Sequence, residues 1–259
     1  MLLYVERSAY RSSWDKWRNG NTNRWTDVVW AYDNIGQFQN FEQIYSSPLQ
    51  EGGSNGNTRE LPGNYIFKDV NGDGMVDGKD MQPLFNGSTP KLHFGLSLDA
   101  KWNGFDFNTL FQGSAFYTVH FSGTFTQVLW SEYNTPAYFY DRWHLSDPYD
   151  TNSAWIPGKW PAAKTANYNG STTRESGAFR KDASYIRLKS MEIGYSIPAK
   201  ILKFVYLETC RFYVNGHNLL TLCDPFVKPF DPEKIEGAYS AGENYPLTKS
   251  YNVGVNISF

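Results

Sequence analysis

The chain has 259 residues, of which 41% are hydrophobic, 19% charged and 17% aromatic, and its formal net charge is -2 at pH 7. No apolar run approaches the roughly 18 residues of a membrane helix, which excludes a helical membrane protein, and the charge balance gives no reason to expect nucleic acid. The low mean hydropathy, -0.53, still permits a β-barrel, because a barrel strand is apolar only at every second residue. The aromatic content suits the interfacial girdles of a barrel and, equally, a sugar-binding surface.

Residues 1–10, MLLYVERSAY, lack the basic start, the long apolar core and the cleavage site of a signal peptide. We predict a strand in this region. A barrel protein of an outer membrane needs such a signal. For that class we therefore expect either an N-terminus further upstream or a chain that is the C-terminal piece of a larger protein.

The strongest chemical motif lies in residues 69–80, DVNGDGMVDGKD, which have the ligand spacing of an EF-hand calcium loop. The expected ligands are the side chains of Asp69, Asn71, Asp73, Asp77 and Asp80 and the backbone carbonyl of Met75. Gly74 allows the sharp turn, whereas Asp80 is shorter than the usual glutamate and less able to bind through both oxygens. Since no helices are predicted on either side, we expect an EF-hand-like loop with a structural Ca²⁺ bound at about 10⁻⁴ to 10⁻³ M. The alternative is an acidic turn that binds no metal.

A hairpin is predicted over residues 91–114. Apolar and polar residues alternate without a break from 91 to 102, close to the roughly 9–11 residues that a tilted strand needs to cross a bilayer. Asn103-Gly104 follows, and this dipeptide favours a type I′ turn because both positions require positive φ. Residues 105–114 then continue the alternation, which predicts a membrane-type hairpin with a tight turn.

Aromatic residues crowd the second long connection, residues 116–184. Exposed rings can stack on sugars or grip a peptide, although so many in one segment more often pack together. The candidates for ligand contact are Trp130, Tyr138, Trp143 and Trp155. Acidic residues also occur here, but nothing places two of them at the separation that a glycosidase requires, so no enzyme is predicted.

Three more strands are predicted, over residues 185–197, 207–216 and 248–259. The first changes phase near Ser190, which a β-bulge would repair. Cys210 shares its face with apolar residues, and a disulfide to Cys223 would require the chain to double back. The last strand ends on the aromatic Phe259.

About six strands result, with short connections on one side and long ones, residues 11–90, 116–184 and 218–247, on the other. This asymmetry is typical of outer-membrane barrels, whose long loops are extracellular and whose C-terminus is periplasmic. Six strands cannot close a barrel, since the smallest have eight. We therefore predict an all-β chain that supplies strands to a large transmembrane antiparallel barrel.

Several blocks resemble the C-terminal region of SusC/RagA-type TonB-dependent outer-membrane transporters. They are residues 67–114, DRW at 141–143, ASYIRLKSMEIGYSIP at 183–198, RFYVNGHNLLTL at 211–222 and the terminal strand KSYNVGVNISF. These blocks occur in the family's order, and YDNIGQFQNFEQI near the start is similar to its preceding extracellular segment.

The resemblance implies a barrel of about 22 strands with an N-terminal plug, of which residues 1–259 would be the C-terminal portion, without the plug and the other strands. It implies import of oligosaccharides or oligopeptides, a SusD-like lipoprotein as an extracellular lid, and energy from the TonB complex through the missing part. It also implies that Phe259 belongs to the signal read by the insertion machinery.

Two other classes stay open on the residues alone. The aromatic residues and the calcium loop also fit a secreted calcium-dependent carbohydrate-binding module, and unpaired acids are all that favours a secreted glycoside hydrolase. The asymmetry of the loops and the aromatic C-terminus favour the barrel. The transported ligand and its contacts do not follow from the sequence.

Overall fold

The computed structural model describes residues 27–50, 56–128, 134–163, 172, 174–233 and 245–259. These residues belong to two compact units, each assembled from segments far apart in the sequence. Among the described residues, the first unit draws on residues 27–50, 56–88, 118–128, 134–163, 172 and 174–181, and the second on residues 89–117, 182–233 and 245–259. The strand predicted within residues 1–10 lies outside the described residues.

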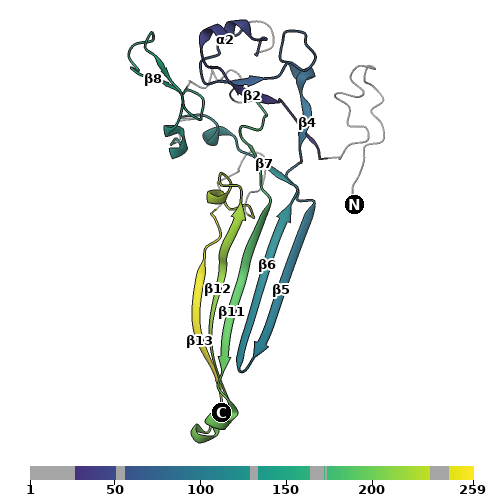
Figure 1. The fold of residues 1–259 in the computed structure, drawn as a ribbon, viewed down its shortest axis with the longest axis vertical. Helices are drawn as coiled ribbons and strands as arrows, with labels where there is room; N and C mark the ends of the chain where they lie inside the picture. The colour runs from purple at the N-terminus through teal and green to yellow at the C-terminus, as the bar shows by residue number, and fades with distance from the viewer. Residues whose placement is uncertain (1–26, 51–55, 129–133, 164–171, 173, 234–244) are drawn as a thin grey trace, which may run out of the picture. The chain divides into compact units, whose positions relative to one another are not determined.

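The second unit contains a five-stranded antiparallel sheet in the order β13-β12-β11-β6-β5 (Figure 1). Its strands are β5 (Leu92–Trp102), β6 (Phe105–Ala115), β11 (Tyr185–Ser196), β12 (Thr209–Cys223) and β13 (Ser250–Ser258). The all-β prediction is confirmed. β12 runs seven residues beyond its predicted end at residue 216.

Local geometry explains how these strands connect. Asn103 and Gly104 have φ of 47° and 86°, so both adopt the positive φ that the predicted tight turn between β5 and β6 requires. β11 shifts register between Leu188 and Ser190 against both neighbouring strands, which confirms the bulge predicted near Ser190. Short helices α3 (Ala199–Leu202) and η7 (Lys203–Val205) connect β11 to β12.

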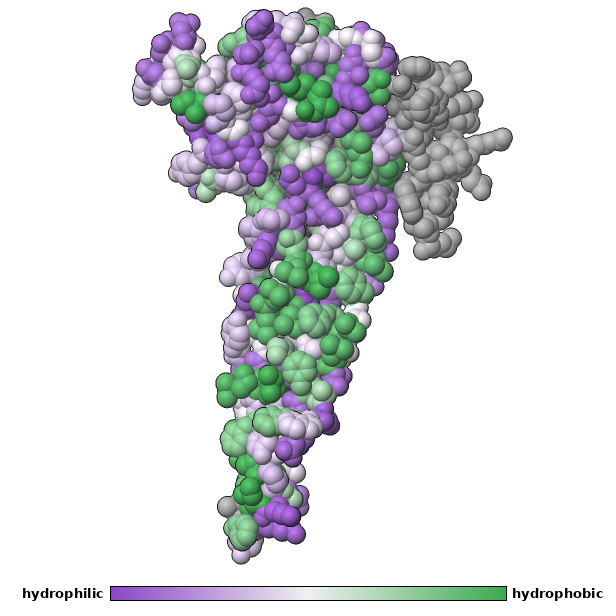
Figure 2. Space-filling view, in the orientation of Figure 1, coloured by the Kyte–Doolittle hydropathy of each residue, from purple (hydrophilic) through white to green (hydrophobic). Residues whose placement is uncertain are grey.

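One face of this sheet is apolar across all five strands. A single row of paired positions shows the pattern, because Ala100, Phe107, Ile193, Val214 and Val253 are neighbours on successive strands. Many side chains on this face are exposed, and Val253 reaches 82%. Figure 2 shows apolar side chains gathered over the strands of this sheet. Such a continuous exposed face marks a surface that meets another apolar phase.

The first unit is built from short antiparallel pairs around an aromatic core. The pairs are β1 (Val29–Ala31) with β4 (Gln82–Phe85), β2 (Asn34–Gln37) with β3 (Tyr65–Phe67), β7 (Thr118–His120) with β10 (Arg180–Asp182), and β8 (His144–Leu145) with β9 (Trp155–Ile156). Its largest fully buried apolar side chains include Phe38, Phe67 and Phe121.

Helices in the first unit are short. α2 (Phe41–Ser46) begins after Asn40, whose side chain accepts a hydrogen bond of 2.8 Å from the Gln43 N–H and so caps the helix. The 3₁₀ helices are η1 (Gly78–Asp80), η2 (Gly123–Phe125) and η4 (Ala137–Tyr140), and η8 (Lys228–Phe230) belongs to the second unit. Within the described part of the chain, no helix is long and apolar enough to span a membrane.

Candidate functional site

The acidic loop, residues 69–80, is held together by its own carboxylates. The carboxylate of Asp69 accepts from the Gly72 and Gly74 N–H groups at 2.7 and 2.8 Å. Gly72 and Gly74 have φ of 76° and 83°, a backbone conformation that other residues adopt at a cost, so the glycines are required by the turn. The chain therefore turns around the Asp69 carboxylate.

Asp80 closes the same loop from its far end. Its side chain is fully buried, and its carboxylate accepts from the N–H groups of Val70, Asn71 and Asp77 at 2.8, 3.3 and 2.8 Å. Three backbone donors occupy the carboxylate that the sequence assigned to the last ligand position. Through these three hydrogen bonds, Asp80 holds the two ends of the loop together.

The remaining candidate ligands lie on the exposed side of this loop. Asn71 Oδ1 accepts from the Asp73 N–H at 2.9 Å, and Asp73 Oδ1 accepts from the Met75 N–H at 3.0 Å. The Lys79 ammonium lies 3.9 Å from Asp73 Oδ2 and 3.8 Å from Asp77 Oδ2, so a cation already sits between two of these carboxylates. Across the described residues, no three His, Cys, Asp or Glu side chains converge as a metal site. The donors are nevertheless all hard oxygens, the type that Ca²⁺ prefers.

Backbone contacts join the acidic loop to two other segments of the first unit. The Leu49 N–H donates to the Gly74 carbonyl at 2.9 Å, and the Val76 N–H donates to the Leu49 carbonyl at 2.7 Å. Arg174 Nη1 donates to the carbonyl of the fully buried Val76 at 3.0 Å. Hydrogen bonds therefore tie the loop to both segments.

Two of the four aromatic candidates are packed. Trp143 is only 3% exposed and lies against Gly63, where a Cβ atom would overlap its side chain. The Tyr138 hydroxyl donates to the Phe125 carbonyl, and its ring centroid lies 4.9 Å from that of Trp160. These contacts give Tyr138 and Trp143 a role in shaping the second long connection.

The other two aromatic candidates for ligand contact are Trp155 and Trp130. Trp155 lies in β9, pairs with Leu145 and is half-buried, so part of its ring is accessible. Trp130 lies outside the described residues. The structure also exposes Tyr140 and Tyr149 almost completely, and the sequence did not distinguish these two from the other aromatic residues.

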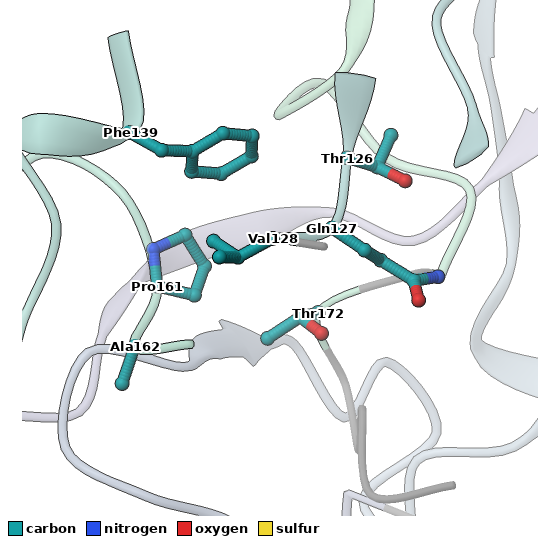
Figure 3. Close-up of a pocket in the computed structure, with 7 residues that line it drawn as sticks. All are labelled: Thr126, Gln127, Val128, Phe139, Pro161, Ala162 and Thr172. Carbon is teal, nitrogen blue, oxygen red and sulfur yellow. The ribbon is translucent and has the colours of Figure 1, made fainter. Parts of the chain in front are cut away.

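A small cleft lies beside the packed aromatic residues of the first unit. Figure 3 shows Phe139 and Pro161 on one side and Thr126 and Gln127 on the other. Its volume of about 10 Å³ is close to the minimum that holds one water molecule. The cleft is therefore too small for a sugar or a peptide side chain.

The first unit also contains an ionic network around Glu175. Arg180 Nε donates to Glu175 Oε1 at 2.6 Å, and His120 Nδ1 lies 3.3 Å from the same oxygen. Burial alone would raise the pKa of Glu175, but the nearby His120 ring and the hydrogen bond from Arg180 outweigh it and lower the pKa below the ordinary value. Glu175 is therefore a charged anchor for the β7–β10 pair.

The face of the sheet opposite the apolar one is polar and hydrogen-bonded. Arg211 on β12 forms ion pairs with Asp106 on β6 and with Glu192 on β11, the latter at 2.7 Å. Its side chain passes over Gly194, where a Cβ atom would overlap the guanidinium group. The glycine thus lets a cation on one strand reach an anion two strands away.

A second ionic cluster on the polar face was missed by the sequence reasoning. Arg187 on β11 is 2% exposed and pairs with Asp231, which is 4% exposed, and with Glu233 at 2.7 Å. Lys189 also contacts Glu233, at 3.0 Å. The available signal was an arginine at a polar-face position of a strand together with the acidic run Asp231-Pro-Glu233. Nothing in the local sequence connects the two.

Both cysteines are free, and Cys210 is buried. Phe259 is exposed and directly follows β13, which forms one edge of the sheet.

Known proteins were compared with this chain in sequence and in fold. No protein-family model matches the chain. The chain is 27% identical over 249 residues to TonB-dependent receptor P3 of Formosa agariphila, a match that covers 91% of the chain and 23% of the relative. It is 25% identical over 238 residues to TonB-dependent receptor P26 of the same organism, covering 87% of the chain and 22% of that relative. The chain spans less than a quarter of the length of these relatives.

Solved structures of a peptide transporter have a similar fold. The RagAB peptide transporter matches with a TM-score of 0.60 at 18% identity, over 92% of the chain and 23% of the matched chain. The RagAB peptide importer in its "open-open" state matches with a TM-score of 0.56 at 18% identity, over 90% of the chain and 22% of the matched chain. The order of the motifs, the fold of the sheet and both curated relatives support the resemblance of the chain to a part of a SusC/RagA-type TonB-dependent receptor.

Proposed function

We propose that the receptor containing this chain imports oligosaccharides or oligopeptides across an outer membrane. The observation that carries this proposal is the two-faced sheet, which is apolar and exposed on one side and polar and hydrogen-bonded on the other. Such a sheet suits a barrel wall between lipid and a water-filled interior. The relatives are named as receptors and importers, which favours transport over a soluble carbohydrate-binding module.

Strand length is consistent with this role. The 11 residues of β5, at about 3.3 Å each, extend over about 36 Å. Tilted by about 45°, this length covers about 26 Å along the bilayer normal, close to the apolar band of about 25 Å on outer-membrane barrels.

The lengths of the connections support a proposed orientation. The turns at Asn103-Gly104 and at residues 197–208 are short, whereas the connections at the other ends of the same strands are long. We propose that the long connections are extracellular, that the C-terminus is periplasmic and that Phe259 contributes to the signal for barrel insertion. The edges of β5 and β13 then pair with the remaining strands, which enclose the plug.

The proposed partners follow from the family. A SusD-like lipoprotein would cover the extracellular side, and the TonB complex would supply energy through a part of the receptor beyond this chain. One solved structure of similar fold is that of a peptide importer, which supports oligopeptides for that protein, and the sequence resemblance supports oligosaccharides equally. Trp155, whose ring is partly accessible, is the described aromatic candidate for ligand contact, beside Trp130.

We also propose that the acidic loop binds one structural Ca²⁺. The ligands would be the side chains of Asp69, Asn71, Asp73 and Asp77 and the Met75 carbonyl, with Asp80 holding the ends of the loop. Binding would displace the Lys79 ammonium, which lies between Asp73 and Asp77. Because the loop contacts Leu49 and Arg174, the ion would stiffen that part of the first unit.

Uptake by cells tests the transport proposal. The gene encoding this chain is deleted from its native bacterium, and the uptake of fluorescent oligosaccharides and oligopeptides is compared with that of the parent and of a strain lacking TonB. We expect at least one ligand to lose uptake in both mutants and to regain it with the restored gene. Unchanged uptake of every ligand in the deletion strain would overturn the proposal.

A further inference from the structure

A pocket of about 150 Å³ opens in the second unit where β13 separates from β12. The pairing of the two strands ends at His217 and Ser250, although β12 continues to Cys223. At this point Asn218 has a φ of 54°, and its Nδ2 donates to the Thr248 carbonyl at 3.0 Å. The side-chain contact replaces the strand pairing, which leaves a space between β12 and residues 246–249.

The walls of this pocket are held in place by buried polar contacts. Asp231 accepts from Arg187 with one oxygen and, at 2.8 Å, from the Leu247 N–H with the other. Arg187 Nε also donates to Thr221 Oγ1 at 3.0 Å. The pocket is therefore preorganised, which reduces the entropy lost when a ligand binds.

Positive charge dominates the lining. It contains Arg187, Lys228 and Lys249 and a single carboxylate, that of Asp231, which is already paired with Arg187. The ammonium groups of Lys228 and Lys249 form no ion pair with any described residue. Two cations at one pocket that lack an ion-pair partner among the described residues attract an anionic group.

The lining also offers an acceptor without a donor. The Oδ1 atom of Asn218 is buried and receives no hydrogen bond among the described residues. An unsatisfied buried acceptor costs free energy that a hydroxyl or amide N–H from a ligand would recover. Leu247 and Pro232 add apolar surface beside it.

We infer that this pocket binds the carboxylate-bearing end of an acidic ligand, with Lys228 and Lys249 facing the carboxylate and Asn218 accepting from a neighbouring hydroxyl or amide group. The volume suits one sugar or amino-acid unit and not a longer oligomer. The carboxylate could belong to a uronic acid or to the C-terminus of a peptide, since both present the same charged group. The site would serve the uptake function proposed above by selecting acidic ligands.

Equilibrium binding to the full receptor in detergent tests this site without any transport step. The probes are D-glucuronate, an N-acetylated dipeptide and neutral D-glucose, measured by saturation-transfer NMR at low salt. The variant Lys228→Gln/Lys249→Gln is compared with Lys200→Gln/Lys203→Gln, which removes the same charge from the exposed turn between β11 and β12. Thermal melting checks that both variants are folded.

We expect glucuronate or the dipeptide to bind the wild type more tightly than glucose does. We expect the pocket variant to weaken that binding about tenfold, and the control variant to change it less than twofold. Whichever acidic probe binds identifies the source of the carboxylate. Glucose binding as tight as that of both acidic probes, or a pocket variant within twofold of the wild type, would overturn the inference. Loss of uptake in cells with binding intact would instead concern the transport proposal.

Discussion

Val253 on β13 distinguishes a lipid-facing sheet from a water-exposed one. Its side chain is 82% exposed, and it pairs with Val214 within the apolar face. In water, substituting arginine at such an exposed site would change stability by less than about 0.5 kcal/mol. In a bilayer, arginine on the lipid face of a barrel costs about 2–4 kcal/mol near the midplane. The cost of the substitution therefore differs between the two environments by about 1.5 kcal/mol or more.

The assay is unfolding of the full receptor by guanidinium chloride in phospholipid vesicles, followed by tryptophan fluorescence. Val253→Arg is compared with Asn252→Arg, the adjacent residue on the polar face. The Asn252 side chain donates a hydrogen bond to Asn215 Oδ1 at 2.9 Å. Losing this hydrogen bond in the Asn252→Arg variant should cost about 1 kcal/mol. A Val253→Arg variant within about 0.5 kcal/mol of the wild type would refute the assignment of this face to lipid.

Three further predictions concern contacts within the units. Gly194→Ala should destabilise the receptor by about 1–3 kcal/mol, because the added Cβ displaces Arg211 from Asp106. The control Gly95→Ala should cost less, because its Cβ would lie 3.8 Å from the nearest neighbouring atom. Equal midpoints of urea unfolding for the two variants would contradict this prediction. Asp231→Asn leaves the buried Arg187 without its main counter-charge and should cost about 3–5 kcal/mol in the same assay; a loss under about 1 kcal/mol would show that Glu233 suffices. Ca²⁺ should raise the melting temperature of the wild type and of Asp147→Ala but not of Asp69→Ala/Asp73→Ala; no rise in the wild type would remove the calcium proposal.

The sequence predicts the sheet well where alternation is strict and turns are encoded locally. Residues 91–102 give β5 within one residue, and Asn103-Gly104 adopts the predicted positive φ. The bulge near Ser190 is also predicted, because a two-residue period that changes phase has few structural solutions. The extension of β12 is missed because Asn218, in the left-handed region, interrupts the regular strand that the alternation describes.

Contacts between distant residues do not follow from the sequence. Arg187 and Asp231 are 44 residues apart, and only the packing of the second unit shows that they neutralise each other. The burial of Trp143 depends on Gly63, in another segment, leaving space for its ring. For the acidic loop, the spacing predicts ligands around a calcium ion, but not that backbone N–H groups bind the carboxylates of Asp69 and Asp80.

The most direct test of the proposal that this sheet faces lipid is the accessibility of spin labels along β13. Single cysteines are introduced from residue 250 to 258 in the full receptor, with Cys210 and Cys223 replaced by serine, and the receptor is reconstituted in vesicles. We expect labels at 251, 253, 255 and 257 to be relaxed by lipid-soluble oxygen, and labels at 250, 252, 254, 256 and 258 by a water-soluble nickel complex. Equal access of the nickel complex to both sets would contradict a sheet with one face in the membrane.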